Sequence, residues 1–425
     1  MKNALRVGVV GIGRVGLPFA AVCSKFYDTV GIDASPSVVK NVNLRVRFSE
    51  PKLNGYLEEF GLRASTDFRS LASQDIVVLS VGSQASGSGY SSRNLISALD
   101  QVSPYLTSKN QVLVILTTLP PVSIAKELFP YFEKHQTLDR IAGICYNPTM
   151  IALGNAVDGF ENPDYVLIGE SNVQSGDLVE SFWQGIVSED IPIFRSSITN
   201  IALAKYALNT ALTLKITLLN TITELSEKLG GDIDILSEIL KTDPRIGGPK
   251  MFKGGLGYGG TCFPVDVDAL RSECEELGIP TTLADAVQSI NDRQVERSIH
   301  LIESYGKKSV SILGATYRPD TSVVVASQSL QIAERLADHG YEVMIYDPMG
   351  IEGAKAQLGE KVVYSTDLHK ALSFGNIVFL GVEWPEFREL GKESFRNNQI
   401  VIDPWRMLRS KDLECTYLGY GLAKQ

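Results

Sequence analysis

The chain has few of the residues that bind metals or form disulfide frameworks. Its 425 residues include five cysteines and four histidines, and neither set shows CxxC or another metal-binding spacing. The scattered cysteines indicate reduced thiols and a cytoplasmic setting. The chain also lacks an excess of positive charge: 49 acidic residues outnumber 40 lysines and arginines. The net charge of −9 argues against a nucleic-acid partner, although local basic pockets for phosphate groups are still compatible with it.

Long apolar runs are absent as well. No uninterrupted apolar stretch reaches the roughly 18 residues that a membrane span needs, and the N-terminus leads directly into a predicted strand without a signal-peptide pattern. The hydrophobic fraction of 44% is that of an ordinary globular protein. At this length we expect two or three domains, each large enough to bury its own core.

A glycine-rich turn follows the first predicted strand. Residues 5–10 are apolar and lead into an amphipathic helix through the sequence GIGRVG, which comprises Gly11, Ile12, Gly13, Arg14, Val15 and Gly16. In this strand–turn–helix setting, GxGxxG binds the pyrophosphate of a dinucleotide. The first glycine permits the tight turn, the second lets the pyrophosphate approach the backbone, and the third lets the helix pack on the strand. The helix N-terminus then faces the phosphates.

The ends of the next predicted strands complete this candidate dinucleotide site. Asp33 follows the glycines by about 20 residues, where a carboxylate binds the ribose hydroxyls and repels a 2′-phosphate, so the sequence favours NAD over NADP. The apolar stretches 75–82 and 111–118 are typical of buried parallel strands. They end at Val81, Gly82 and Thr118, where an open parallel sheet places its ligand contacts. The weaker alternative for Thr118 is an ordinary turn residue.

Residues 254–266 combine a candidate catalytic nucleophile with a glycine-rich loop suited to binding a ligand. This segment reads GGLGYGGTCFPVD, with Cys262 behind a run of glycines. Glycines let the backbone take positive φ and approach a ligand closely. The thiol can act as a nucleophile if a neighbouring cation or helix terminus stabilises the thiolate. The alternative is a buried, inert cysteine beside a turn.

A long helix is predicted from about residue 196 to 229, with Thr199 or Asn200 as its cap and Gly230 after its end. Its broad apolar surface suggests a helix that crosses between domains and pairs with a second copy of the chain, giving a homodimer. Lys205 and Asn209 lie four residues apart and so share one face. Arg245, Lys250 and Lys253 precede the glycines and suit a phosphate-bearing ligand.

The last third repeats the plan of the first. Residues 309–320 predict a strand and a glycine-containing turn, and a helix, a strand ending at Asp347 and two further strands follow. The turn lacks the full glycine fingerprint. Such a domain could hold a second nucleotide-like ligand through Arg318 and Arg406, or it could be purely structural. The fold class is therefore α/β, with two Rossmann-like doubly wound parallel-sheet domains joined by a long central helix and a helical middle domain. The expected ranges are 1–195, 196–300 and 301–425.

In this order the motifs resemble the UDP-glucose/GDP-mannose dehydrogenase family, which oxidises nucleotide sugars at C6. The resemblance covers nearly the whole chain through the sequences GIGRVGLP, TTLPP, YNP, AKYALNTALTLKITLLN, GYGGTCFPxD, LGATYRPDT, VEWPEF and VIDPWR. It implies an NAD-binding first domain, a dimer-forming helix and a third domain that binds a nucleotide sugar, with a UDP-sugar favoured as substrate.

The resemblance also implies roles for single residues. Cys262 matches the nucleophile that forms a thiohemiacetal and then a thioester. Lys205 and Asn209 match the pair that stabilises the oxyanion, while Asp266 and Thr118 match groups that position the lysine and a water. The matches to the nucleotide-sugar contacts are Arg245, Lys253, Tyr258, Gly259, Gly260, Arg318 and Arg406.

The chain departs from the family pattern at several of its polar positions. Where the family reads NPEFLREG, this chain has Thr149 and Leu153 in place of two glutamates and Ala152 in place of an arginine, and Val265 replaces the lysine of FPKD. Loss of the acids weakens the expected activation of water. Three readings therefore stay open: a full dehydrogenase, a member that stops at the thioester or uses an unusual sugar, and a non-catalytic nucleotide-sugar-binding protein.

Overall fold

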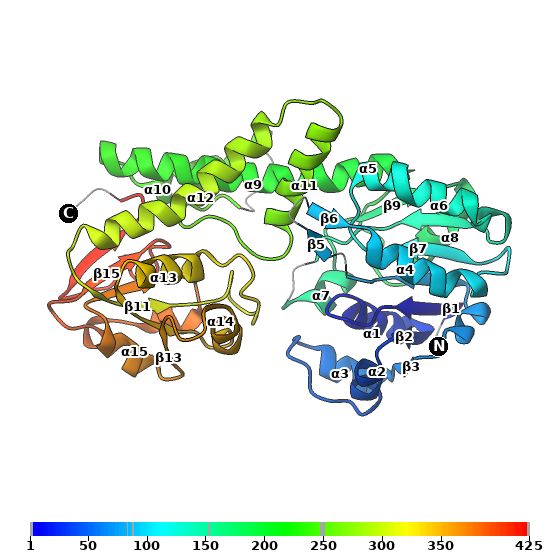
Figure 1. Ribbon diagram of the computed structural model, residues 1–425, viewed down its shortest axis with the longest axis horizontal. Helices are drawn as coiled ribbons and strands as arrows, with labels where there is room; N and C mark the ends of the chain where they lie inside the picture. The colour runs from blue at the N-terminus through cyan, green and yellow to red at the C-terminus, as the bar shows by residue number, and fades with distance from the viewer. Residues whose placement is uncertain (1–2, 83, 87–88, 152–153, 247–250, 423–425) are drawn as a thin grey trace. The chain divides into compact units, whose positions relative to one another are not determined.

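A computed structural model describes residues 3–82, 84–86, 89–151, 154–246 and 251–422 (Figure 1). The chain forms two compact units, Met1–Ala207 and Leu208–Gln425. The boundary falls inside the 32-residue helix α9 (Ile198–Leu229). Each unit has a sheet and a hydrophobic core of its own.

Unit 1 is built on an eight-stranded sheet with the order β10-β9-β8-β7-β4-β1-β2-β3. All neighbouring strands are parallel except β8 and β9. The central strands β4 and β7 read IVVL and VLVI and are buried throughout, as expected for strands covered on both faces. The strands are β1 (Asn3–Val10), β2 (Tyr27–Ile32), β3 (Arg63–Ser65), β4 (Ile76–Leu79), β7 (Val112–Ile115), β8 (Gly143–Tyr146), β9 (Val166–Glu170) and β10 (Ile193–Ser197), and a separate antiparallel pair is formed by β5 (Gln84–Ser86) and β6 (Gly89–Ser91).

The core of unit 1 joins α1 to the later helices. Phe19 of α1 packs edge-on against Phe160 with ring centroids 5.0 Å apart and also contacts Phe182 and Trp183. This aromatic cluster fixes α1, and with it the glycine turn that precedes α1. The helices are α1 (Gly16–Phe26), α2 (Pro36–Asn43), α3 (Leu53–Phe60), α4 (Arg93–Val102), α5 (Pro121–Ser123), α6 (Phe129–Lys134), α7 (Ala156–Glu161) and α8 (Val173–Gln184).

Unit 2 contains a six-stranded, all-parallel sheet with the order β13-β12-β11-β14-β15-β16. In both sheets the order therefore reverses next to the first strand, which is the doubly wound arrangement, and the predicted fold class is confirmed. The strands are β11 (Ser309–Leu313), β12 (Glu342–Tyr346), β13 (Val363–Ser365), β14 (Ile377–Leu380), β15 (Ile400–Asp403) and β16 (Thr416–Gly419), and the helices are α10 (Ile233–Thr242), α11 (Phe263–Glu276), α12 (Thr282–Glu303), α13 (Gln328–Asp338), α14 (Ile351–Leu358) and α15 (Leu368–Phe374).

The cap predicted for the long helix was wrong. Because α9 begins at Ile198, both Thr199 and Asn200 lie within its first turn. Ser197 takes the capping role instead, since its Oγ accepts a hydrogen bond from the backbone N of Asn200 at 3.2 Å. The end is as predicted, with Gly230 at φ 75°. Among the helices that the structure describes, none combines the length and the apolar character that crossing a membrane requires.

Candidate functional site

The glycine turn of unit 1 has the geometry of a dinucleotide site. Gly11 has a φ of 86°, and a Cβ on Gly16 would lie 1.9 Å from the carbonyl oxygen of Gly11, so the turn and the close start of α1 both require glycine. A Cβ on Gly13 would meet nothing within 4 Å. This open backbone is where a pyrophosphate can approach the N-terminus of α1. Ile12 is buried, Arg14 is exposed, and Val15 precedes the first residue of α1.

Asp33 lies beside this turn at the end of β2. Its Oδ2 accepts a hydrogen bond from the backbone N of Ile12 at 3.1 Å, and its Oδ1 accepts one from Ser35 at 2.9 Å. An ionised carboxylate has about four acceptor positions, so the half-buried Asp33 can still bind ribose hydroxyls. It lines a cavity of about 240 Å³ together with Gly11, Val81 and Gly82. The end of β7 supports the cavity wall, because Thr117 Oγ1 donates to the carbonyl oxygen of Val81 at 2.8 Å.

The corresponding acid of unit 2 is used differently. Asp347 follows β12 as Asp33 follows β2, but it is 3% exposed. Its Oδ2 accepts hydrogen bonds from the backbone N of Ala315, the backbone N and Oγ1 of Thr316, and Trp384 Nε1. Its Oδ1 accepts two more, from the backbone N of Met349 and of Gly350. Asp347 is therefore committed to the fold, whereas Asp33 keeps acceptor capacity.

The crevice of the second sheet is also nearly filled. Its cavity measures only about 20 Å³ and is bounded by Gly257 and Gly259 on one side and by Thr316, Tyr317 and Gly381 on the other. The glycine-rich loop (residues 254–261) thus lies at the position where a doubly wound sheet usually binds its ligand. Of the two crevices, the one in unit 1 has the room and the free acid that a dinucleotide needs.

Cys262 directly follows this loop and precedes the 14-residue helix α11. Its side chain is exposed, so the buried alternative does not hold. The positive end of the helix dipole favours negative charge at this position, and Thr261 Oγ1 lies 3.7 Å from Cys262 Sγ. One turn further, Asp266 is 1% exposed and accepts a hydrogen bond from Asn209 Nδ2. Unit 2 thus brings Cys262, Asp266 and Asn209 to one end of α11.

Lys205 lies one turn before Asn209 in α9, and its side chain is 6% exposed. Its Nζ donates to the carbonyl oxygen of Thr149 at 3.0 Å and lies 3.4 Å from Met150 Sδ. Thr149 stands where the family pattern has a glutamate, and its backbone carbonyl oxygen accepts the hydrogen bond from Lys205. Thr118 is half-buried after β7, and Val265 is half-buried in the first turn of α11. Ala152 and Leu153 lie outside the described residues.

The predicted cations of unit 2 fall into two groups. Arg245 is 86% exposed and pairs with Asp243, while Lys253 pairs with Glu383 and lies 5.9 Å from the Trp405 ring centroid. These two are accessible to a ligand. Arg318 Nε donates to the hydroxyl of Tyr317 at 3.0 Å, and Arg406, with a side chain 1% exposed, is held by hydrogen bonds inside the unit. Lys250 lies outside the described residues.

The remaining predicted contacts belong to the glycine-rich loop. Tyr258 is 5% exposed, and burial raises the pKa of its hydroxyl above the usual range. Gly259 packs against the backbone of Ala326, where a Cβ would lie 2.4 Å from the carbonyl oxygen. Gly260, with a φ of 86°, packs against the ring of Tyr317. The sequence analysis missed Tyr317 and Trp405, although both stand directly beside residues that the family motifs had marked.

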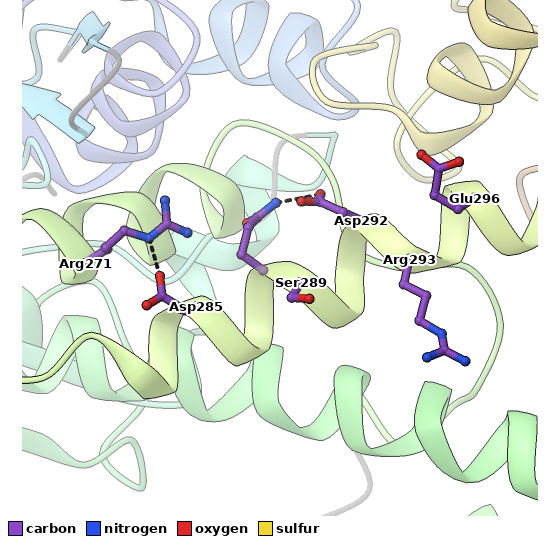
Figure 2. Close-up of a pocket in the computed structure, with 7 residues that line it drawn as sticks. Arg271, Asp285, Ser289, Asp292, Arg293 and Glu296 are labelled. Atoms are coloured by element: carbon purple, nitrogen blue, oxygen red, sulfur yellow. Dashed lines mark hydrogen bonds and ion pairs between the residues drawn. The ribbon is translucent and has the colours of Figure 1, made fainter.

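A wider cavity of about 490 Å³ lies between α11 and α12 (Figure 2). Its charged groups are paired within unit 2: Arg271 with Asp285 and Arg293 with Glu224. Gln288 donates to Asp292 at 2.7 Å. The charged side chains of this cavity thus pair with other side chains of unit 2, as on a solvated surface. In the described ranges no three His, Cys, Asp or Glu side chains form a group suited to a metal ion.

Unit 1 has an open crevice at a glycine turn, with an acid beside it, and the profile of an NAD binding domain matches residues 5–187. The protein is therefore an NAD-dependent oxidoreductase. The chain belongs to the UDP-glucose/GDP-mannose dehydrogenase family. The profile of its NAD binding domain matches residues 5–187, that of its central domain matches 200–293, and that of its UDP binding domain matches 311–410.

Individual relatives extend over the whole chain. The putative UDP-glucose 6-dehydrogenase YtcA of Bacillus subtilis is 30% identical and the alignment covers 98% of this chain and 100% of that protein. A UDP-glucose 6-dehydrogenase of Rickettsia bellii is 28% identical, with 98% of each chain covered. The solved structure of a UDP-glucose dehydrogenase from the hyperthermophilic archaeon Pyrobaculum islandicum superposes with a TM-score of 0.89 at 26% identity, covering 99% of both chains.

Proposed function

We propose that the protein oxidises the C6 hydroxyl of a UDP-sugar to the carboxylate in two NAD-dependent steps, with Cys262 as the covalent nucleophile. The observation that carries this proposal is the exposed thiol at the N-terminus of α11, one turn from the buried pair Asp266 and Asn209. Related proteins of the same length are named UDP-glucose 6-dehydrogenases, which supports a UDP-hexose as the substrate.

The chain's own residues account for each step. NAD, when bound, would supply the hydride acceptor, with one NAD molecule consumed in each of the two oxidations. In the first oxidation the alcohol loses a hydride and a proton and becomes an aldehyde. Cys262 Sγ then bonds to the aldehyde carbon, a proton passes to the aldehyde oxygen, and a thiohemiacetal results. Loss of a hydride from its carbon and of the proton from its hydroxyl leaves a thioester. Lys205 and Asn209 carry donors on one face of α9 that stabilise negative charge on the sugar oxygen. Water finally breaks the carbon–sulfur bond and releases the uronate and the thiol.

Hydrolysis of the thioester is the step for which the chain has the fewest of the family's polar side chains. Thr118 and Asp266 remain to position the water, but Thr149 and Leu153 stand where the family has glutamates. General-base assistance contributes about two to four powers of ten in rate, so we expect slow turnover of the thioester. This replacement also favours the second candidate, a member of the family that accumulates the thioester.

The nucleotide is assigned to unit 2. Arg245 and Lys253 are the accessible cations there, and they suit a diphosphate. Arg318, Tyr258, Gly259 and Gly260 are proposed to complete the site around the sugar. Arg406 is proposed to contribute through its hydrogen bond to the carbonyl oxygen of Gly254 at 2.9 Å.

A homodimer through α9 completes the proposal. Four leucines of α9 follow one another at spacings of four, seven and four residues and are all exposed in the single chain: Leu214, Leu218, Leu225 and Leu229. Such spacings place them on one face, where a second copy of the helix would cover them.

The activity is tested by incubating the purified protein with NAD and a panel of UDP-glucose, UDP-N-acetylglucosamine and UDP-N-acetylmannosamine. We expect NADH with at least one sugar, and loss of this signal in Cys262→Ser while NAD binding persists. Mass spectrometry of the protein after turnover separates the two candidates, since a sugar retained on Cys262 means that hydrolysis has failed. A protein that binds NAD yet forms no NADH with any nucleotide sugar contradicts the proposal.

A further inference from the structure

We propose that Asn220, Asn291 and Gln328 act as positioning residues that hold the glycine-rich loop in its ligand-binding conformation. We call these three side chains the carboxamide clamp. The inference rests on the proposed function, because the loop is the segment that leads to Cys262 and carries the expected sugar contacts. It concerns residues outside the predicted site, and all of its contacts lie within unit 2.

Asn220 holds the start of the loop. It lies in α9 with a side chain 0% exposed. Its Oδ1 accepts a hydrogen bond from the backbone N of Gly255 at 3.0 Å, and its Nδ2 donates to the carbonyl oxygen of Leu256 at 3.2 Å. Both ends of the amide are therefore committed to the loop backbone.

Asn291 holds the middle of the loop in the same way. It comes from α12 and is 5% exposed. Its Oδ1 accepts from the backbone N of Tyr258 at 2.7 Å, while its Nδ2 donates to the carbonyl oxygen of Tyr258 at 3.1 Å. A side chain that bonds both polar groups of one residue reproduces the pairing of an antiparallel strand. The loop gains an ordered backbone without belonging to a sheet.

Gln328 connects this arrangement to the second sheet. It is the first residue of α13 and is 6% exposed. Its Oε1 accepts from the backbone N of Gly257 at 2.7 Å, and its Nε2 donates to the carbonyl oxygen of Asn291 at 3.0 Å. The clamp is thus continuous: three helices that are distant in sequence meet on four successive loop residues.

The glycines of the loop fit this arrangement. A Cβ on Gly257 would lie 2.0 Å from Asn291 Oδ1 and 2.3 Å from Gln328 Nε2, and a Cβ on Gly254 would lie 2.0 Å from Thr223 Oγ1. A side chain at position 257 would expel the carboxamides of Asn291 and Gln328, and one at position 254 would displace the hydroxyl of Thr223. The glycines therefore permit the close approach of the clamp, and the loop is held in one conformation before a ligand arrives. Such preorganisation lowers the entropy that a ligand must remove on binding.

The test combines amide hydrogen exchange with binding of UDP as the probe. In Asn291→Leu and Gln328→Leu we expect the amides of Gly257 and Tyr258 to exchange about tenfold faster, since a buried donor loses its acceptor. We expect UDP to bind about tenfold more weakly, while NAD, bound by unit 1, binds as in the wild type. Gln294→Met is the matched control, because Gln294 is equally buried on α12 but bonds Glu224, Ile290 and Arg297.

A conservative variant separates positioning from general stability. Gln328→Glu keeps an oxygen that accepts from the Gly257 N–H but loses the Nε2 donor to the carbonyl oxygen of Asn291, so it removes one of the two clamp bonds of Gln328. We expect it to protect the Gly257 amide better, and to bind UDP more tightly, than Gln328→Leu does. If Asn291→Leu does not fold, the two Gln328 variants decide the question.

Two results would overturn the clamp. One is exchange at Gly257 and Tyr258 no faster than in Gln294→Met. The other is faster exchange with unchanged UDP affinity. A wild-type protein that binds no UDP would instead refute the proposed function, and the exchange measurements would still report on the loop.

Discussion

Replacing Gly13 with alanine tests the dinucleotide crevice without disturbing the fold. A Cβ at this position meets nothing within 4 Å, and the residue does not need positive φ. We therefore expect the free energy of unfolding to change by no more than about 0.5 kcal/mol, the range of ordinary surface substitutions. The added methyl group occupies the space through which a pyrophosphate approaches the backbone N–H groups.

The expected loss of affinity follows from those N–H groups. A hydrogen bond to a charged group contributes about 1.5–3 kcal/mol, which corresponds to about a 10- to 150-fold increase in the Kd for NAD. Isothermal titration calorimetry with NAD and thermal unfolding of the same preparation measure the two quantities. Gly55→Ala is the matched control, because its Cβ also meets nothing within 4 Å but Gly55 lies in α3.

One outcome of the comparison between Gly13→Ala and Gly55→Ala would contradict the predicted position of the pyrophosphate. If Gly13→Ala binds NAD as tightly as Gly55→Ala, the pyrophosphate does not lie over the glycine turn. Gly16→Ala should behave differently from both, because its Cβ would lie 1.9 Å from the Gly11 carbonyl oxygen and would destabilise unit 1 itself.

Three further predictions concern stability and assembly. Arg406→Met should lower the free energy of unfolding in urea by about 3–5 kcal/mol, because it leaves three buried carbonyl oxygens without their donor at about 1–3 kcal/mol each, while Asp234 keeps its pairing with Arg409; the more exposed Arg409→Met is the control, and equal losses would contradict the reasoning. The Arg69 side chain lowers the pKa of Asp67 to about 2, so its stabilising effect is present above the unfolded value of about 3.9 and is lost as the pH falls towards 2. The urea midpoint of Asp67→Asn should therefore lie below that of the wild type at pH 6 and approach it as the pH falls to 3, and a constant difference would refute the assignment. The double variant Leu218→Glu and Leu225→Glu should sediment as a monomer in analytical ultracentrifugation, whereas Val173→Glu, at an exposed apolar position in α8, should leave the dimer intact.

Local pattern was sufficient for much of the fold and for the geometry of the glycine turn in unit 1. The strands, the glycine turn and Asp33 lie within about one βαβ unit, where neighbouring residues determine the geometry. The role of Asp347 could not be predicted in this way. Its partner Trp384 lies 37 positions away along the chain, and the sequence around Asp347 resembles that around Asp33. Only tertiary contacts distinguish an acid that binds a ligand from one that completes the fold.

The glycine-rich loop shows the same limit. Its composition predicts a backbone free to adapt to a ligand, yet Gly257 is glycine because Asn291 and Gln328 approach it within the volume of a side chain. These partners lie 34 or more residues further along the chain, so no local pattern reveals them. Nor does a motif show that Arg406 is buried, because the family match concerns its identity and not its environment.

The two sheets have the same strand order but differ in what occupies the crevice beside the first strand. In unit 1 the crevice has a volume of about 240 Å³ and a half-exposed acid. In unit 2 the volume falls to about 20 Å³, because the chain's own loop enters and Gln328, at the start of α13, binds the Gly257 N–H. The crevice beside the first strand thus stays open in unit 1, whereas in unit 2 it holds a segment of the chain itself. If this reasoning is correct, weakening the contact between Gln328 and Gly257 should loosen the loop without creating a second NAD site, because Asp347 would remain saturated by its six donors.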